Sequence, residues 1–449
     1  YFKETAFEAI QRRKGRMNEN DRKLQCNLIR WSLDISRLSE DDFINEKYNG
    51  EERKESQKEW REFAIEMADK IEREAIWNEG RTKVTWLALR YSNDPRLDVQ
   101  IETCDYYLYE GLAGIILFMK AMQASIGEYE DLCRTAENVL FEYTDSVYEG
   151  KRDPDSDYTG LYCGEGAIVY TYQTLFQFTG EQKYLFYAIK HAEILKRLIE
   201  YDKSIDILYG NAGAIIAFCG LYKVTNNIEY LEYAKEAEKF LRHNLQKSEE
   251  GVFFRGHGME KPCAGIAHGN SGLILAYGQL WQYTKEVIYT DVLFDLLSYE
   301  NMLFKDRQKG MKETDWKTSQ LPSWCHGDLG ILWTYLKLKE MTGAEFDHET
   351  KIVLENGEKI LEKVGLRRSM GICHGNFGNL LLMKECSENL QIGSNITYRF
   401  EKKVKDLLSE ERFLMLKERL DYGLMQGIAG AGYSCLKLHK LITEDKIFI

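Results

Sequence analysis

Two short motifs carry side chains that bind soft metal ions. Cys325-His326-Gly327 and Cys373-His374-Gly375 each place a Cys-His pair directly before a glycine. Thiolate and imidazole are the side chains that zinc prefers, and three protein ligands with one open position are typical of catalytic zinc. An open position beside thiolates suits an incoming thiol, whose pKa the metal would lower. The motifs therefore indicate zinc-assisted attack by a substrate thiolate.

Both motifs belong to a glycine signature, Gly-x-x-Gly, that recurs seven times. In the second unit alanine replaces the last glycine. An apolar run follows each signature, and a charged amphipathic stretch precedes most of them, for example 181–200, 227–247 and 348–364. Near-regular recurrence predicts a repeat architecture in which each unit is a polar outer helix, a glycine loop and an apolar inner helix. The first glycines of the seven units are Gly111, Gly164, Gly210, Gly269, Gly327, Gly375 and Gly427.

Seven such units can bury their apolar helices by closing into a ring. Closure also removes the end faces that an open solenoid must cap. We therefore expect an all-α fold, an α/α toroid of seven inner and seven outer helices. An N-cap residue type follows the first glycine in four units, which places the glycine loops at the N-termini of the inner helices. These residues are Asn211, Asn270, Asp328 and Asn376.

The regions outside the repeat are short. Residues 1–39 read as two charged amphipathic helices broken near 15–20, and we interpret 1–56 as a helical extension or a linker from a preceding domain. Residues 57–449 form the predicted repeat domain, whose first outer helix runs from about Gln57 to Trp77. Alternating apolar residues at 82–89 and 97–101 predict a small β-hairpin inserted before the first glycine loop.

Composition limits the classes of function. The chain has 449 residues and a net charge of −12, which argues against binding nucleic acid and weakly favours cationic peptides. Its 10 cysteines form no compact framework, which favours reduced thiols in a cytoplasm. No signal peptide and no stretch long enough to span a membrane is recognisable. Because the first residue is Tyr1 and not Met, we expect a piece of a longer polypeptide.

Aligning the seven loops on their first glycine separates ligands from proton-transfer candidates. Cys325, Cys373 and His374 are the predicted zinc ligands, while Cys163 is either a rival ligand or a small buried side chain. Addition of a thiolate to an activated alkene leaves an enolate that needs a proton, and His268 and His326 are the candidates to supply it. A hydrogen-bonded scaffold role suits His326 equally well. The residues before the glycines are Glu110, Cys163, Tyr209, His268, His326, His374 and Gln426.

These motifs resemble the lanthionine synthetase C-like cyclases. The resemblance rests on Trp-Cys-His-Gly, Cys-His-Gly, Ala-His-Gly-Asn-Ser-Gly and the sevenfold glycine repeat, and it covers about residue 57 to the C-terminus. It implies a toroid with one zinc ion that adds peptide cysteine thiols to dehydroalanine or dehydrobutyrine, giving lanthionine or methyllanthionine rings. It also implies zinc ligation by Cys325, Cys373 and His374, and an acid–base role for His268. The N-terminal features look like the cyclase half of a class II bifunctional synthetase, in which a dehydratase domain precedes the cyclase.

One position departs from the family. A catalytic aspartate usually stands four residues before the first glycine of the first loop, where this chain has Tyr107. Asp105, two residues earlier, could reach the same space, so we include it among the catalytic candidates; an exposed loop carboxylate is the alternative.

Three other functions compete with the peptide cyclase. A prenyltransferase subunit would also use zinc to activate a thiol. A glycoside hydrolase would need paired carboxylates, and the loops offer only Glu110, Glu165 and Asp328, in three different units. A non-catalytic peptide-binding scaffold is the third, and retention of all three predicted zinc ligands argues against it.

Overall fold

The computed structural model describes residues 4–35, 58–91, 99–255, 261–308, 322–344, 365–366, 369–390, 395–409 and 421–442. The chain divides into two compact units, one of Tyr1–Glu46 and Leu89–Glu102, the other of Lys47–Ala88 and Thr103–Ile449. The domain boundary that we predicted at residue 56 falls within 36–57, outside the described residues, and it stays a prediction.

The smaller unit contains the two predicted N-terminal helices, α1 (Ala6–Arg16) and α2 (Glu19–Ile35). α1 begins with a capping box, because the Thr5 side chain accepts from the Glu8 amide while the Glu8 carboxylate accepts from the Thr5 amide. The break between the helices lies inside the predicted interval 15–20, so this part of the prediction is confirmed.

The larger unit has the predicted inner helices, one directly after each glycine signature. They are mostly buried because their residues are apolar on nearly every side. The seven are α5 (Leu112–Ile126), α7 (Glu165–Thr179), α9 (Asn211–Thr225), α11 (Asn270–Thr284), α13 (Asp328–Thr342), α15 (Asn376–Asn389) and α18 (Ile428–Leu438).

Amphipathic outer helices flank them. In α10, for example, Tyr230, Ala234 and Leu241 form a buried stripe, while most of the charged residues remain at least partly exposed. The outer helix predicted at 348–364 lies outside the described residues. The described outer helices are α4 (Trp60–Arg73), α6 (Glu130–Tyr148), α8 (Gln182–Leu198), α10 (Glu229–His243), α12 (Val287–Gln308) and α16 (Asn395–Leu408).

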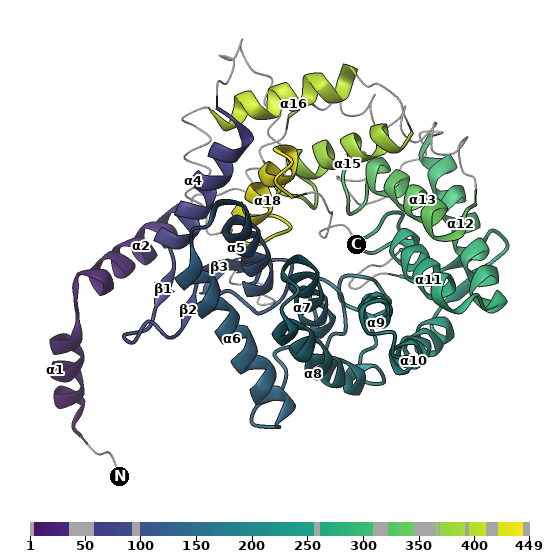
Figure 1. The fold of residues 1–449 in the computed structure, drawn as a ribbon. Coiled ribbons are helices and arrows are strands. Elements are labelled where there is room, and N and C mark those ends of the chain that lie inside the picture. Colours follow the sequence, from purple (N-terminus) through teal and green to yellow (C-terminus); the bar gives the residue numbers. More distant parts are fainter. Residues whose placement is uncertain are drawn as a thin grey trace. The chain divides into compact units, whose positions relative to one another are not determined.

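The inner helices close into a ring, as Figure 1 shows for the larger unit. Each inner helix contacts the next, and α18 contacts α5. The loops before the helices also pair by backbone hydrogen bonds: the Leu108 amide donates to the Tyr162 carbonyl at 3.1 Å, and the Met425 amide donates to the Tyr109 carbonyl at 3.0 Å. The second of these bonds joins the last loop to the first, so the predicted α/α toroid is confirmed.

Strands are short and occur only in pairs in the described part of the chain. β1 (Ile76–Trp77) pairs antiparallel with β2 (Val84–Thr85), and β3 (Leu87–Tyr91) pairs with β4 (Val99–Thr103). The region before the first glycine loop therefore holds two strand pairs where we predicted one hairpin, and the first outer helix ends at Arg73, before Trp77. A third pair, β5 (Gln246–Ser248) with β6 (Gly251–Phe253), was not predicted.

Close backbone approach explains the second glycine of the signature. A Cβ atom at Gly430 would lie 1.8 Å from the Leu424 carbonyl oxygen, and one at Gly330 would lie 2.1 Å from that of Trp324. In both loops this carbonyl lies six residues before the glycine, so the turn that starts the inner helix leaves no room for a side chain.

The N-cap assignment needs a correction. The first glycine itself is the N-cap of each inner helix, for example Gly210 for α9 and Gly269 for α11. Asn211 and Asn270 are the first helical residues, and their side-chain amides donate to backbone carbonyls of neighbouring elements. Asn211 donates to Ile199, just after α8, while Asn270 donates to Val252 in β6 at 2.9 Å and to Leu296 in α12 at 3.0 Å. These amides therefore join inner helices to neighbouring elements, where we had expected caps.

Replacing the second glycine should destabilise the ring. Because the Leu424 carbonyl occupies the space of the new methyl group, we expect Gly430→Ala to lower the free energy of unfolding by about 3 kcal/mol or more. Urea denaturation followed by circular dichroism measures this. Gly80→Ala is the matched control, since its Cβ would meet nothing closer than 3.8 Å. Equal unfolding midpoints for the two variants would contradict the steric explanation.

Candidate metal centre and acid–base pair

Cys325, Cys373 and His374 converge in the structure, although they come from two different loops. Their ligand atoms all lie within 4.8 Å of one another; both cysteines are buried and the histidine is half-buried. The loops are held together by the amides of Trp324 and Cys325, which both donate to the Cys373 carbonyl, at 3.0 and 3.3 Å. The predicted ligand set is thus brought together by main-chain pairing of the fifth and sixth loops.

The pKa values of the two thiols are shifted in opposite directions. The pKa of Cys325 is held well below its ordinary value, chiefly by a hydrogen bond from Cys373 and further by the nearby His326. Burial raises the pKa of Cys373, and the neighbouring Cys325 raises it further. Two thiolates at this spacing would therefore require a cation. Two sulfurs and one imidazole suit a soft transition metal, and three ligands leave a position open.

Tyr109 and Gln426 contribute contacts that the sequence analysis did not identify. The Gln426 side-chain amide donates to the Tyr109 hydroxyl at 3.0 Å, and that hydroxyl also forms a hydrogen bond with Cys373. Burial, followed by the two nearby sulfurs, raises the pKa of Tyr109 well above its ordinary value. Tyr109 therefore stays protonated and orients the thiol side of the cluster.

His268 is paired with a buried carboxylate. Its Nδ1 lies 2.8 Å from Asp206 Oδ2, and the Asp206 side chain is fully buried. Because a carboxylate only accepts, Nδ1 carries the proton, and Nε2 is the atom that exchanges protons with a substrate. The imidazole stacks on Tyr209, at a centroid distance of 6.0 Å, and on His326, at 5.6 Å. His326 thus contacts His268 and also lies near the Cys325 thiol.

Asp206 was not among the predicted residues, and the catalytic role of Asp105 stays a prediction. The Asp105 carboxylate accepts from the Tyr107 amide at 2.9 Å within its own loop. Asp206 stands four residues before Gly210, the spacing that we had looked for only in the first loop. Applying that spacing to all seven loops would have found it.

Tyr107, where the resemblance led us to expect an aspartate, belongs to a buried network. Its hydroxyl donates to Glu165 Oε1 at 2.7 Å, Tyr143 donates to the same oxygen at 2.7 Å, and His191 Nε2 lies 2.7 Å from the other oxygen. Glu165 is fully buried. This network joins the first two loops, and it removes Glu165 from the carboxylates available to a glycoside hydrolase.

The residues before the first glycines form one ring at the loop end of the toroid. All seven are half-buried, whereas the residues two positions earlier are fully buried core. Cys163, in this ring, has a raised pKa because of burial and the nearby Asp105 and Glu110 carboxylates, so it is a poorer thiolate than Cys325. It is not one of the three converging ligands.

The fold and the site together define a toroid with a cluster of two cysteines and one histidine that could hold a metal ion, and with a histidine–carboxylate pair. Residues 102–449 match the model of the family described as lanthionine synthetase C-like protein. The match covers most of the chain, and the chain belongs to this family.

Two relatives agree with this assignment. The chain is 24% identical over 457 residues to the lacticin 481/lactococcin biosynthesis protein LcnDR2 of Lactococcus lactis subsp. lactis, covering 96% of this chain and 46% of that protein. It thus spans about half the length of this curated relative. The solved structure of nisin cyclase superimposes with a TM-score of 0.55 at 17% identity, over 75% of this chain and 89% of that one, which shows a shared fold. No described helix is long and apolar enough to cross a membrane.

Proposed function

We propose that this chain is a zinc-dependent cyclase that adds cysteine thiols of a peptide to its dehydroalanine or dehydrobutyrine residues. The products are lanthionine or methyllanthionine thioether rings. The observation that carries the proposal is the placement of two thiols, an imidazole and a histidine–carboxylate pair on consecutive loops of one ring.

Cys325, Cys373 and His374 would hold the zinc, which when bound lowers the pKa of a substrate thiol in the open position. The hydrogen bond from Tyr109 to Cys373 would keep the ligand side of the site fixed while the substrate exchanges. His374 is half-buried, so the cluster is accessible from the loop end of the toroid.

His268 would move the proton. The substrate sulfur gives up its proton and forms a bond to the β-carbon of the dehydro residue, while the electron pair of the C=C bond shifts toward the adjacent carbonyl as an enolate. The enolate α-carbon then takes a proton, so that no group leaves and the atoms balance. Asp206, bonded to Nδ1, would leave Nε2 of His268 free to exchange a proton with the substrate, and it would stabilise the imidazolium that forms. His326, stacked on His268, would sit beside the developing negative charge.

The substrate would be a dehydrated lanthipeptide precursor, in line with the similarity to a lacticin 481/lactococcin biosynthesis protein. A dehydratase domain of the same polypeptide would supply it, consistent with a chain that spans about half of that relative. Such a protein, with free cysteines at its site, would work in the reducing cytoplasm.

Loss of a ligand should remove the metal without unfolding the toroid. We expect the purified protein to hold about one zinc per chain, and Cys325→Ala, Cys373→Ala or His374→Ala to hold close to none, with the helical circular-dichroism signal largely unchanged because the helices have their own core. Elemental analysis measures the zinc. Cys219→Ala, at another buried cysteine, is the control and should keep its zinc. A Cys373→Ala protein with full zinc content would refute the ligand assignment.

Loss of the acid–base pair should slow ring closure while the zinc stays bound. We expect His268→Ala to cut the rate by roughly 10²–10⁴-fold, because general acid–base catalysis contributes about that much. Asp206→Asn should act in the same direction. Mass spectrometry of a dehydrated, cysteine-containing peptide after thiol alkylation follows the reaction, since a closed ring takes up no alkylating agent.

The control for this pair is His243→Ala, at an exposed histidine in the last turn of α10. A His268→Ala protein that cyclises at the wild-type rate would make this residue a scaffold, and one that loses its zinc would make it a ligand.

A further inference from the structure

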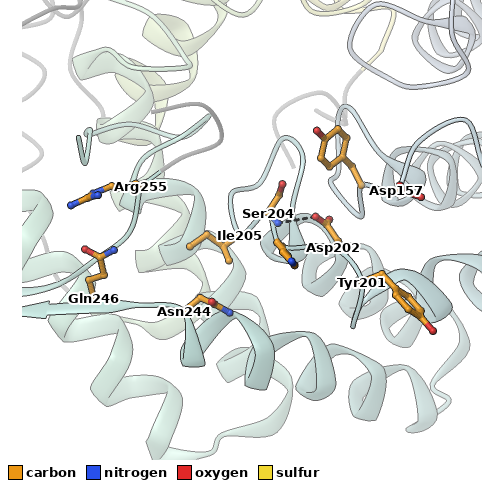
Figure 2. Close-up of a pocket in the computed structure, with 10 residues that line it drawn as sticks. Asp157, Tyr201, Asp202, Ser204, Ile205, Asn244, Gln246 and Arg255 are labelled. Carbon is orange, nitrogen blue, oxygen red and sulfur yellow. Dashed lines mark hydrogen bonds between the residues drawn. The ribbon is translucent and has the colours of Figure 1, made fainter. Parts of the chain in front are cut away.

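A polar pocket of about 510 Å³ lies beside the acid–base pair. Three segments form it: the chain before the second glycine loop, the chain before the third, and the chain around β5 and β6. Figure 2 shows Arg255 and Gln246 on one wall, Asp157 and Tyr201 on the other, and Asp202 and Ser204 between them. Its volume is in the range of ligand sites in proteins.

Two sets of contacts connect this pocket to His268. Tyr158 lines the pocket and packs edge-on against Tyr209 at a centroid distance of 5.2 Å, and Tyr209 stacks on the His268 imidazole. Ser204 and Ile205 also line the pocket, and they directly precede Asp206, whose carboxylate holds His268. A peptide whose reacting residue lies at His268 would therefore place residues adjacent in its sequence at this pocket.

The charged side chains of the pocket differ in whether they already have partners. Asp202 is buried and both its oxygens are used: one accepts from the amide and hydroxyl of Thr159, the other from the Ser204 amide at 2.8 Å. Arg255, Lys203 and Asp157 are exposed and form no ion pair with other residues that the structure describes. Two cations and one anion are thus available to a ligand, with Arg255 and Asp157 on opposite walls.

We propose that this pocket is a specificity subsite for the peptide segment next to the reacting residue, and that it selects a carboxylate side chain through Arg255 and Lys203. The assignment rests on the proposed function. The Gln246 amide would pair with the peptide backbone. Asp157, on the far wall, repels an acid placed there, so a peptide with one acidic residue fits in a single direction.

A charge-reversal experiment tests the subsite. The probes are labelled synthetic peptides with one dehydroalanine, serine in place of cysteine so that no ring closes, and a Glu or Lys at each neighbouring position in turn. Fluorescence anisotropy on the zinc-loaded chain measures the affinity. At one or two positions we expect the wild type to prefer Glu over Lys by about three- to tenfold, and Arg255→Glu to reverse that order.

The control is Arg134→Glu, which reverses an equally exposed arginine on α6 and should leave every preference as in the wild type. Arg255→Glu touches none of the residues that hold zinc or move protons, so its zinc content should be unchanged. Affinities that show no Glu preference at any position, or the same preference in Arg255→Glu as in the wild type, would overturn the subsite.

A second readout separates the subsite from the proposed function. Cysteine-containing versions of the Glu peptides should show a KM increase of similar size in Arg255→Glu, with kcat near that of the wild type. Ring closure by the wild type with no KM change in Arg255→Glu overturns the subsite alone. A zinc-loaded wild type that closes no ring in any peptide overturns the proposed function and the subsite with it.

Discussion

The whole site depends on the belt of backbone hydrogen bonds between neighbouring glycine loops. The Met425 amide donating to the Tyr109 carbonyl joins the last loop to the first. Along the same belt, the Cys325 amide donates to the Cys373 carbonyl, and the Cys373 amide to the Met425 carbonyl at 2.8 Å. The proposed metal ligands are therefore spaced by main-chain hydrogen bonds between the loops. The fifth and seventh loops can adopt this conformation only with glycine at the second position of the signature, because a side chain at Gly330 or Gly430 would collide with a carbonyl of its own loop.

With the loops held in this way, each loop contributes one side chain to the space at the end of the toroid. The position before each first glycine is half-buried all around the ring, so each unit offers one side chain to the same space. His268, His326 and His374 occupy three consecutive places of this kind. Other residues of the loops contact the site: Asp206 orients His268, and Tyr109 contacts Cys373. His268 and Cys373 are thus each contacted by a residue from a different loop.

Much of this was predictable from the sequence because it follows from local periodicity. The inner helices, the toroid and the Cys325, Cys373 and His374 cluster all derive from the repeated glycine spacing. What could not be predicted depends on contacts across loops. The spacing to Gly210 could have pointed to Asp206, but its pairing with His268 is visible only in the structure, as are the contacts of Tyr109 with Gln426 and Cys373. The N-cap prediction was wrong because Asn211 and Asn270 donate to backbone carbonyls of neighbouring elements, which sequence does not reveal. The strand pair β5–β6 is too short to leave a clear alternating pattern.

The central claim is that two loops of the closed ring supply two sulfurs and one nitrogen to a single zinc ion. X-ray absorption at the zinc edge of the purified wild-type chain tests it most directly, because it counts ligand types without a substrate. The account predicts two sulfur scatterers at about 2.3 Å and one imidazole nitrogen at about 2.0 Å, with one lighter atom completing a tetrahedron. A spectrum with four sulfurs, or with only oxygen and nitrogen neighbours, would contradict it.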